Sequence, residues 1–200
     1  MSTDGESFAG RTLEEAVERA AAALAAARHE LLYEVVGGAE DGNVRIRAGL
    51  DPVAVVRGFL MALCQRGGLE LELRLGSEGD EVVGELTGND ARLLTAGGGR
   101  GLDALQYLCN RVLNRRLQHH PPVRLDSQGF KDRRARTLQE AAESAADEAL
   151  RGQRAVVLGP YTPAARREIH LALADDPAVE TESDGEGFLK RVVVRPRRRH

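Results

Sequence analysis

TAGGGRG at residues 95–101 runs without a break into LDALQYLCNRVLNRR at residues 102–116, and this stretch decides the fold. The second part has apolar residues at spacings of three and four: Leu102, Leu105, Leu108, Cys109 and Val112. That spacing predicts an amphipathic helix. Glycines in front of a helix leave its first backbone N–H groups uncovered by any Cβ, at the positive end of the helix dipole. The stretch therefore predicts a phosphate-binding loop.

This loop differs from two common phosphate-binding loops. It lacks the Gly-x-x-x-x-Gly-Lys-Ser/Thr pattern of nucleoside triphosphate-binding loops. It also lacks the strand and GxGxxG order of dinucleotide-binding folds. The helix–glycine loop–helix arrangement instead resembles that of a K homology (KH) domain, in which a Gly-x-x-Gly loop clamps the backbone of a short single strand.

The flanking segments predict the rest of such a domain over residues 49–128. Asp51 and Pro52 form an N-cap and a first helical residue, and Gly67-Gly68 end that helix. Two alternating segments, LELELRL and EVVGELTG, predict a β-hairpin with SEGD as its turn. A short helix at 90–94, the helix after the glycine loop and a strand at 123–126 complete the order αββααβ, which is that of a type II KH domain.

The N-terminal residues 1–48 predict a smaller module. Thr12 and Glu15 have the spacing of a capping box and open an alanine-rich helix that we expect to run to about residue 27. Strands follow at about 30–36 and 44–47, on either side of a glycine-rich turn. We expect a βαββ unit with a small core.

Residues 129–200 predict a third α+β domain. A helical apolar spacing over 131–150 is followed by the strand AVVLG, the helix TPAARREIHLALA, and strands at 179–183 and 188–196. The expected order is αβαββ. The fold class predicted for the whole chain is therefore α+β.

Four segments, in this order over nearly the whole chain, resemble the bacterial Jag family. They are FAGRTLEEAVERAAAAL at 8–24, GNDARLL with the glycine loop and its helix at 88–116, PYTPAARREIH at 160–170, and ETESDGEGFLKRVVVRP at 180–196. The resemblance implies a Jag N-terminal module, a KH domain and an R-three-H domain, the last named for an Arg and a His separated by three residues.

The same resemblance implies a function. A Jag-like protein would act as an RNA chaperone or post-transcriptional regulator that binds single-stranded RNA, with single-stranded DNA as the alternative. It would take part in the control of cell elongation, cell shape and peptidoglycan homeostasis. Its implied partner is a small KH-only protein, and its implied neighbourhood is the membrane insertase and the elongation machinery.

The R-three-H pair here is Arg166 and His170, which lie four residues apart and so project from one face of the predicted helix. Arginine offers a planar, permanently charged fork for phosphate, and histidine offers a donor and a ring that can stack on a base. We expect Ile169, Ala172 and Leu173 to form a separate apolar face. Candidate auxiliary contacts are Arg167, Lys190 and Arg191, each with a solvated or salt-bridged side chain as the alternative.

The glycine loop departs from the family pattern. Ala96 stands where the first glycine is expected, and Gly97, Gly98 and Gly99 bring no basic side chain between the glycines. Arg100 follows directly and is the substitute. We therefore expect this loop to bind nucleic acid more weakly than the Arg166 and His170 face.

The charge of the chain is unevenly distributed. Its net charge is −3, but residues 1–100 carry 17 acidic and 10 basic residues whereas residues 101–200 carry 14 and 18. The C-terminal half is thus net basic, as a nucleic-acid-binding module would be.

Several classes of protein are not supported by the residues. The chain has no HExxH, no nucleophile elbow and no metal-ligand spacing around its two cysteines. It has no apolar run of roughly 18 residues and an acidic, polar start. We expect a cytoplasmic protein that is not an enzyme and needs no cofactor, metal or membrane insertion. The rival interpretation is a protein–protein adaptor whose KH and R-three-H folds have lost most nucleic-acid binding.

Overall fold

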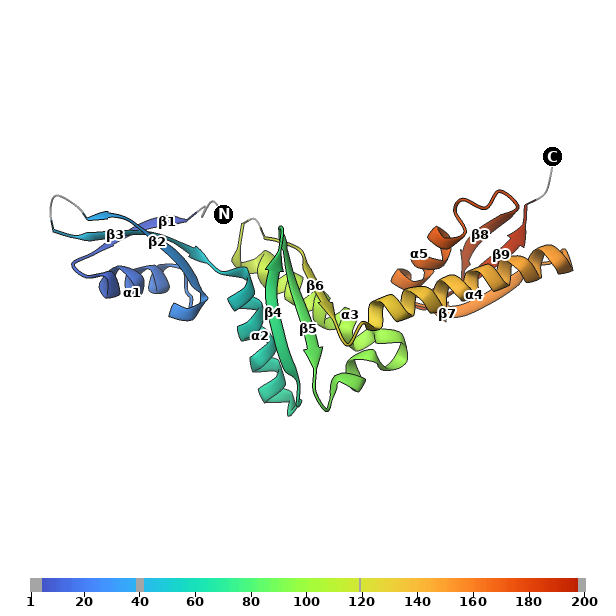
Figure 1. Ribbon diagram of the computed structural model, residues 1–200, viewed down its shortest axis with the longest axis horizontal. Coiled ribbons are helices and arrows are strands. Elements are labelled where there is room, and N and C mark those ends of the chain that lie inside the picture. Colours follow the sequence, from blue (N-terminus) through green and yellow to red (C-terminus); the bar gives the residue numbers. More distant parts are fainter. Residues whose placement is uncertain (1–4, 39–41, 119, 198–200) are drawn as a thin grey trace. The chain divides into compact units, whose positions relative to one another are not determined.

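The computed structural model describes residues 5–38, 42–118 and 120–197 (Figure 1). The chain divides into two compact units, Met1–Gln128 and Gly129–His200. The described residues form three small antiparallel or mixed sheets, each of three strands and each accompanied by helices. This architecture confirms the predicted α+β class.

The first sheet and its helix are the βαββ elements predicted for the N-terminus: β1 Glu6–Gly10, α1 Leu13–Ala23, β2 Leu31–Gly38 and β3 Val44–Leu50. Its strand order is β1-β3-β2, and the pairs are antiparallel. Thr12 caps α1, since its hydroxyl accepts a hydrogen bond from the Glu15 backbone N–H at 3.2 Å. The helix ends four residues earlier than predicted. Ala25 has a left-handed φ of 46°, which ends the helical path, and the short 3-10 helix η1 Arg28–Glu30 follows.

The second sheet holds the elements predicted for the KH domain: α2 Pro52–Gly67, β4 Glu72–Glu78, β5 Glu81–Thr87, α3 Ala91–Arg116 and β6 Val123–Asp126. Strands β4 and β5 pair antiparallel, and β5 and β6 pair parallel. The N-cap and C-cap of α2 are as predicted, with Asp51 accepting from the Val53 N–H and Gly68 in the left-handed conformation. The hairpin turn is shorter than SEGD, because β4 extends through Glu78 and leaves only Gly79 and Asp80 between the strands.

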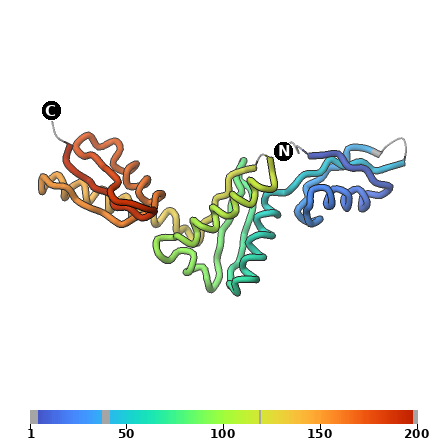
Figure 2. Tube along the Cα trace, turned by 180° about the vertical axis from the view of Figure 1, so that it is seen from behind, coloured from blue at the N-terminus to red at the C-terminus, as the bar shows by residue number. Residues whose placement is uncertain are grey.

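Helix α3 consists of two helices with non-helical backbone at residues 96–99. The break can be followed in the green part of the trace in Figure 2, and it gives the predicted order αββααβ. The buried face of the second of these helices differs from the prediction in that Leu113 takes the place of Leu108. Leu113 is fully buried, whereas Leu108 is 41% exposed. Leu105, Cys109 and Leu113 recur every four residues, and this row faces the sheet.

An ion pair within the first unit joins two segments that are far apart in the sequence. Arg116 Nη1 and Nη2 bond the two carboxylate oxygens of Glu30 at 2.9 and 3.1 Å. Glu30 also accepts from the Ala27 N–H at 3.0 Å, and Arg116 donates to the Ala25 carbonyl at 3.3 Å. Only 12% of the Glu30 side chain and 26% of the Arg116 side chain are exposed. The bond from Arg116 lowers the pKa of Glu30, although burial opposes it.

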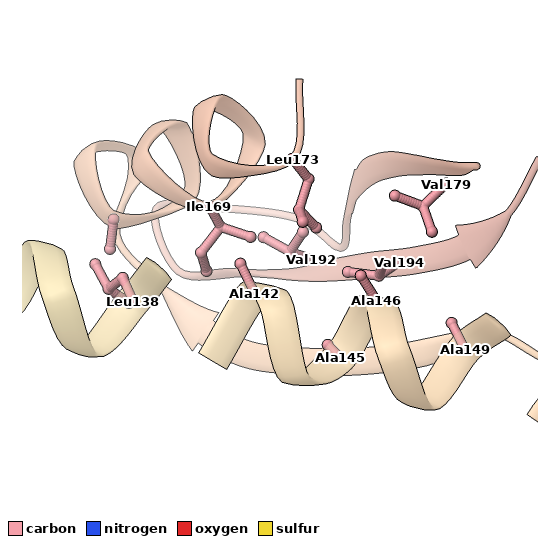
Figure 3. Packing of buried hydrophobic residues seen from close by; sticks show 11 residues of the cluster. Leu138, Ala142, Ala145, Ala146, Ala149, Ile169, Leu173, Val179, Val192 and Val194 are labelled. Carbon is pink, nitrogen blue, oxygen red and sulfur yellow. The ribbon is translucent and has the colours of Figure 1, made fainter. Parts of the chain in front are cut away.

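The second unit contains α4 Phe130–Gly152, β7 Val156–Tyr161, α5 Pro163–Ala172, β8 Val179–Asp184 and β9 Lys190–Pro196. This is the predicted order αβαββ, and the sheet order β7-β9-β8 is antiparallel throughout. Figure 3 shows how Val192 and Val194 of β9 point toward alanines of α4 and toward Ile169 of α5. Both helices therefore cover one face of this sheet. Small alanine side chains let α4 lie close to the strands.

Candidate nucleic-acid interface

Helix α5 places Arg166 and His170 beside the core of the second unit. Thr162 caps the helix, and its hydroxyl accepts from the Ala165 N–H at 3.4 Å. The buried face of α5 is Ala165, Ile169 and Leu173. Ala172, which we expected on the apolar face, is exposed, because the row at spacing four runs through Ala165 instead.

The Arg166 and His170 side chains converge on two hydroxyl groups of β8. Arg166 Nη1 donates to Ser183 Oγ at 2.8 Å. His170 Nδ1 lies 2.7 Å from Thr181 Oγ1, and its Nε2 lies 3.0 Å from Ser183 Oγ. Both ring nitrogens are thus hydrogen-bonded, and Ser183 links the ring to the guanidinium. We call Arg166, His170, Thr181 and Ser183 the R-three-H cluster.

The sequence patterns did not identify Thr181 and Ser183 as residues of the site. They alternate with the exposed Glu180 and Glu182, so they lie on the helix-facing side of β8 together with the buried Val179. One pattern in the sequence could have identified them. Thr181 and Ser183 occupy the same alternate positions of the strand as the apolar Val179, and these positions face inward. A polar side chain at such a position needs a partner, and here the partners are the Arg and the His.

The surroundings of the His170 imidazole favour its neutral form. Burial lowers its pKa below the ordinary 6.5, and the positive charge of Arg166 lowers it further. A neutral ring has one donor and one acceptor nitrogen, and either tautomer can bond both hydroxyls. The cluster thus fixes the ring orientation without a charge on the ring.

Arg166 is only partly engaged by the cluster. Its Nε is buried and bonds to no group among the described residues. The bond to Ser183 through Nη1 anchors the guanidinium, and the side chain as a whole is half-buried. The planar fork is thus oriented before any ligand arrives.

We expect the lowered pKa of His170 to appear in the pH dependence of stability. Folding favours the neutral ring, so its contribution is complete above about pH 6.5 and is lost as the pH falls, because the unfolded chain takes up the proton. The free energy of unfolding should therefore decrease more steeply for the wild type than for His170→Gln between about pH 7.5 and about pH 5.5. Urea denaturation at both pH values measures this difference. Equal decreases in the two proteins would contradict it.

The auxiliary candidates do not lie on one surface. Arg167 is exposed on α5. Alternate residues of a strand point to the same face, so Lys190 points with Val192 and Val194 to the helix-covered face of β9. Arg191 pairs with Asp184 and points to the opposite face. Strand alternation thus places only Lys190 on the same side of the sheet as the R-three-H cluster, and the two residues cannot both extend one basic surface.

The glycine loop has an unusual backbone. Gly97, Gly98 and Gly99 have φ values of 60°, 77° and 84°, so three successive residues are left-handed. Ala96 has φ −58° and ψ 151°, a conformation that any residue adopts, so the Cβ of this residue does not strain the loop. A Cβ added at Gly97 would lie 2.9 Å from Nη2 of Arg100, so this side chain folds back over the loop. Arg100 and the glycines thus lie together as one candidate site.

Within residues 5–38, 42–118 and 120–197 no group of three His, Cys, Asp or Glu side chains could hold a metal ion. Burial raises the pKa of the Cys109 thiol to about 12, which keeps it protonated and unreactive. In the same parts of the chain, every helix is too short or too polar to cross a bilayer.

A helix that presents Arg and His four residues apart against a three-stranded sheet defines an R-three-H domain protein. In agreement, the family model of the R-three-H domain matches residues 136–196. The "RNA-binding protein KhpB" of Clostridium symbiosum is 32% identical over 198 residues, covering 92% of this chain and 88% of that protein. The chain therefore belongs to the Jag/KhpB family, which confirms the resemblance seen in the sequence.

Two further relatives carry the same name. The "RNA-binding protein KhpB" of Bacillus subtilis (strain 168) is 25% identical over 205 residues, covering 95% of this chain and 97% of that protein. The "RNA-binding protein KhpB" of Lactiplantibacillus plantarum is 37% identical over 102 residues, covering 51% of this chain and 32% of that protein. The first two similarities extend over nearly the whole length of the chain.

Proposed function

We propose that this protein binds single-stranded RNA and is not an enzyme, with the R-three-H cluster as its main contact and the glycine loop as a weaker one. The observation that carries this proposal is the bonding of both Arg166 and His170 to Ser183, which orients a cationic fork beside an imidazole before ligand binds. A preorganised site loses less side-chain entropy on binding. The names of the relatives support RNA as the ligand.

The two side chains have different roles in this proposal. The Arg166 guanidinium is permanently charged and forms charge-assisted bonds to a backbone phosphate. The His170 ring is uncharged at neutral pH, so it contributes a hydrogen bond or a stacking surface instead of charge. We therefore place any change in binding due to protonation of His170 below about pH 6.5, where the ring gains a second donor.

The test is a titration of a fluorescein-labelled single-stranded RNA, followed by anisotropy at two salt concentrations. We expect affinity to fall as salt rises, with a shallow slope because few cations take part. The same length of single-stranded DNA distinguishes RNA from general single-strand binding, because only RNA has the 2′-hydroxyl. Absence of binding at low salt would favour the adaptor interpretation.

The weaker contact is tested at Gly98, where an added Cβ meets nothing within 4 Å. Gly98→Asp places a carboxylate at the loop, and Gly98→Asn is the uncharged variant of the same shape. Asp and Asn both tolerate the left-handed conformation. We expect the Asp variant to bind RNA more weakly than the Asn variant, but to lose less affinity than Arg166→Ala. A greater loss at Gly98→Asp would make the KH loop the main contact.

One observation favours association with a protein partner as a second activity. A largely apolar groove of about 490 Å³ is formed by residues of α2 and α3. It is lined by Phe59, Leu108, Arg111, Val112, Asn114 and Arg115. We propose this groove for a small KH-only partner. Leu108→Lys should abolish co-purification of that partner from the native host, whereas Met61→Lys, at an exposed position of α2 outside the groove, should retain it.

We further propose a cytoplasmic role near the membrane insertase and the elongation machinery, in cell shape and peptidoglycan homeostasis. The support is membership of the Jag/KhpB family alone. Deletion of the gene should alter cell length or width, and a copy with Arg166→Ala should fail to restore them. Restoration by that copy would separate the cellular role from RNA binding.

A further inference from the structure

The turn between β8 and β9 carries the most exposed large apolar side chain in the described part of the protein. Phe188 is 66% exposed. Gly185 and Gly187 have φ values of 110° and 78°, which side chains rarely allow, and these two residues give the turn its course before Phe188. A phenyl ring left in water gives up the free energy that its burial would provide, so its position calls for an explanation.

The strand pairing places this turn at the R-three-H cluster. Ser183, which bonds both Arg166 and His170, is the next-to-last residue of β8, and the turn begins after Asp184. On the other side of the turn, Lys190 pairs with Tyr161, which directly precedes the N-cap of α5. The turn therefore lies at the end of the hairpin that faces the start of α5, where Arg166 is located.

The charges around the turn indicate which part of a nucleic acid, the phosphate or the base, can lie against it. Asp184 and Glu186 are exposed in or beside the turn and repel phosphate, whereas Arg166 and Lys190 attract it. If Arg166 binds one phosphate of a nucleic acid strand, the part of the strand that contacts the turn would thus be a base and not a second phosphate. Aromatic faces accept bases of any sequence, because every base has a π surface.

We propose that Phe188 is a base-stacking residue of the RNA site, next to the phosphate contact at Arg166. This inference rests on the proposed function and adds a specific contact to it. It also supplies an aromatic platform in a chain that has no Trp, four Phe and three Tyr.

The chain contains no tryptophan, so Phe188→Trp introduces a single indole as a reporter. Titration with a single-stranded RNA should quench its emission, in step with the anisotropy of the labelled strand. An abasic oligonucleotide of the same length carries the phosphates without the bases and should leave the emission unchanged. Val157→Trp is the matched control, because Val157 is exposed on the sheet face opposite to α5 and should show no quenching.

Affinity gives a second measurement. Phe188→Ala should weaken RNA binding about 5- to 150-fold, as loss of a stacking ring does, and Phe188→Tyr should retain it. Circular dichroism should show these variants folded, since the side chain is exposed. If the wild type binds RNA with a salt dependence while Phe188→Trp is not quenched and Phe188→Ala binds equally well, the stacking role is overturned and the proposed function stands. Absence of RNA binding by the wild type overturns both.

Discussion

Replacement of Arg166 by alanine is expected to weaken binding of single-stranded RNA by about 1–3 kcal/mol, which is the contribution of a charge-assisted hydrogen bond to phosphate. The effect should be large because Ser183 holds the guanidinium in place, so the wild type loses little entropy when it binds. Anisotropy titrations at one fixed low salt concentration measure the loss. Ser183→Ala should show part of it, since the guanidinium then loses its anchor.

Arg167→Ala is the matched control for this prediction. Arg167 has the same charge and lies on the same helix, but its side chain is exposed. Removal of its side chain should reduce affinity much less than Arg166→Ala does. It should also make the dependence of affinity on salt slightly shallower. Arg166→Ala with wild-type affinity, in a protein that circular dichroism shows to be folded, would exclude the R-three-H cluster as the main contact.

Removal of Arg116 is expected to lower the free energy of unfolding by about 2–3 kcal/mol, because it leaves the Glu30 carboxylate largely buried without its charged partner. The control is Arg47→Ala, which breaks the exposed pair of Arg47 with Glu34 and should cost less than about 1 kcal/mol. Urea denaturation at neutral pH compares the two. Equal losses would contradict a special role for the Arg116 pair.

The same pair predicts a dependence on pH. Arg116 lowers the pKa of Glu30 from its ordinary 4.5, so the stabilisation is present above about pH 4.5 and is lost as the pH falls and the carboxylate takes up a proton. The wild type should therefore lose more stability than Arg116→Ala when the pH is lowered from about 7 to about 4. Parallel decreases would show that Glu30 does not titrate with folding.

Local patterns were sufficient to predict most elements and the Arg and His of the candidate site. The spacing of Arg166 and His170 is a property of one helix, as are the caps at Thr12, Asp51 and Gly68. The partners Thr181 and Ser183 depend instead on how β8 packs against α5. Helical periodicity alone could not decide between Leu108 and Leu113, because both are compatible with the apolar stripe of α3.

Contacts between distant segments left no local pattern to find. Glu30 and Arg116 are 86 residues apart, and each reads as an ordinary surface charge in its own segment. Lys190 and Arg191 are neighbours in the sequence, yet strand alternation separates them to opposite sides of the sheet. The three-dimensional packing of the strands decides both cases.

The three successive left-handed glycines of the loop also limit how this protein can evolve. A lysine or arginine at Gly97, Gly98 or Gly99 would have to adopt a backbone conformation that costs about 1 kcal/mol or more for most side chains. Stronger RNA binding through this loop is therefore more accessible by mutations outside the glycines. Thr95, in the short helix before the loop, is a position where selection could add a positive charge without straining the backbone.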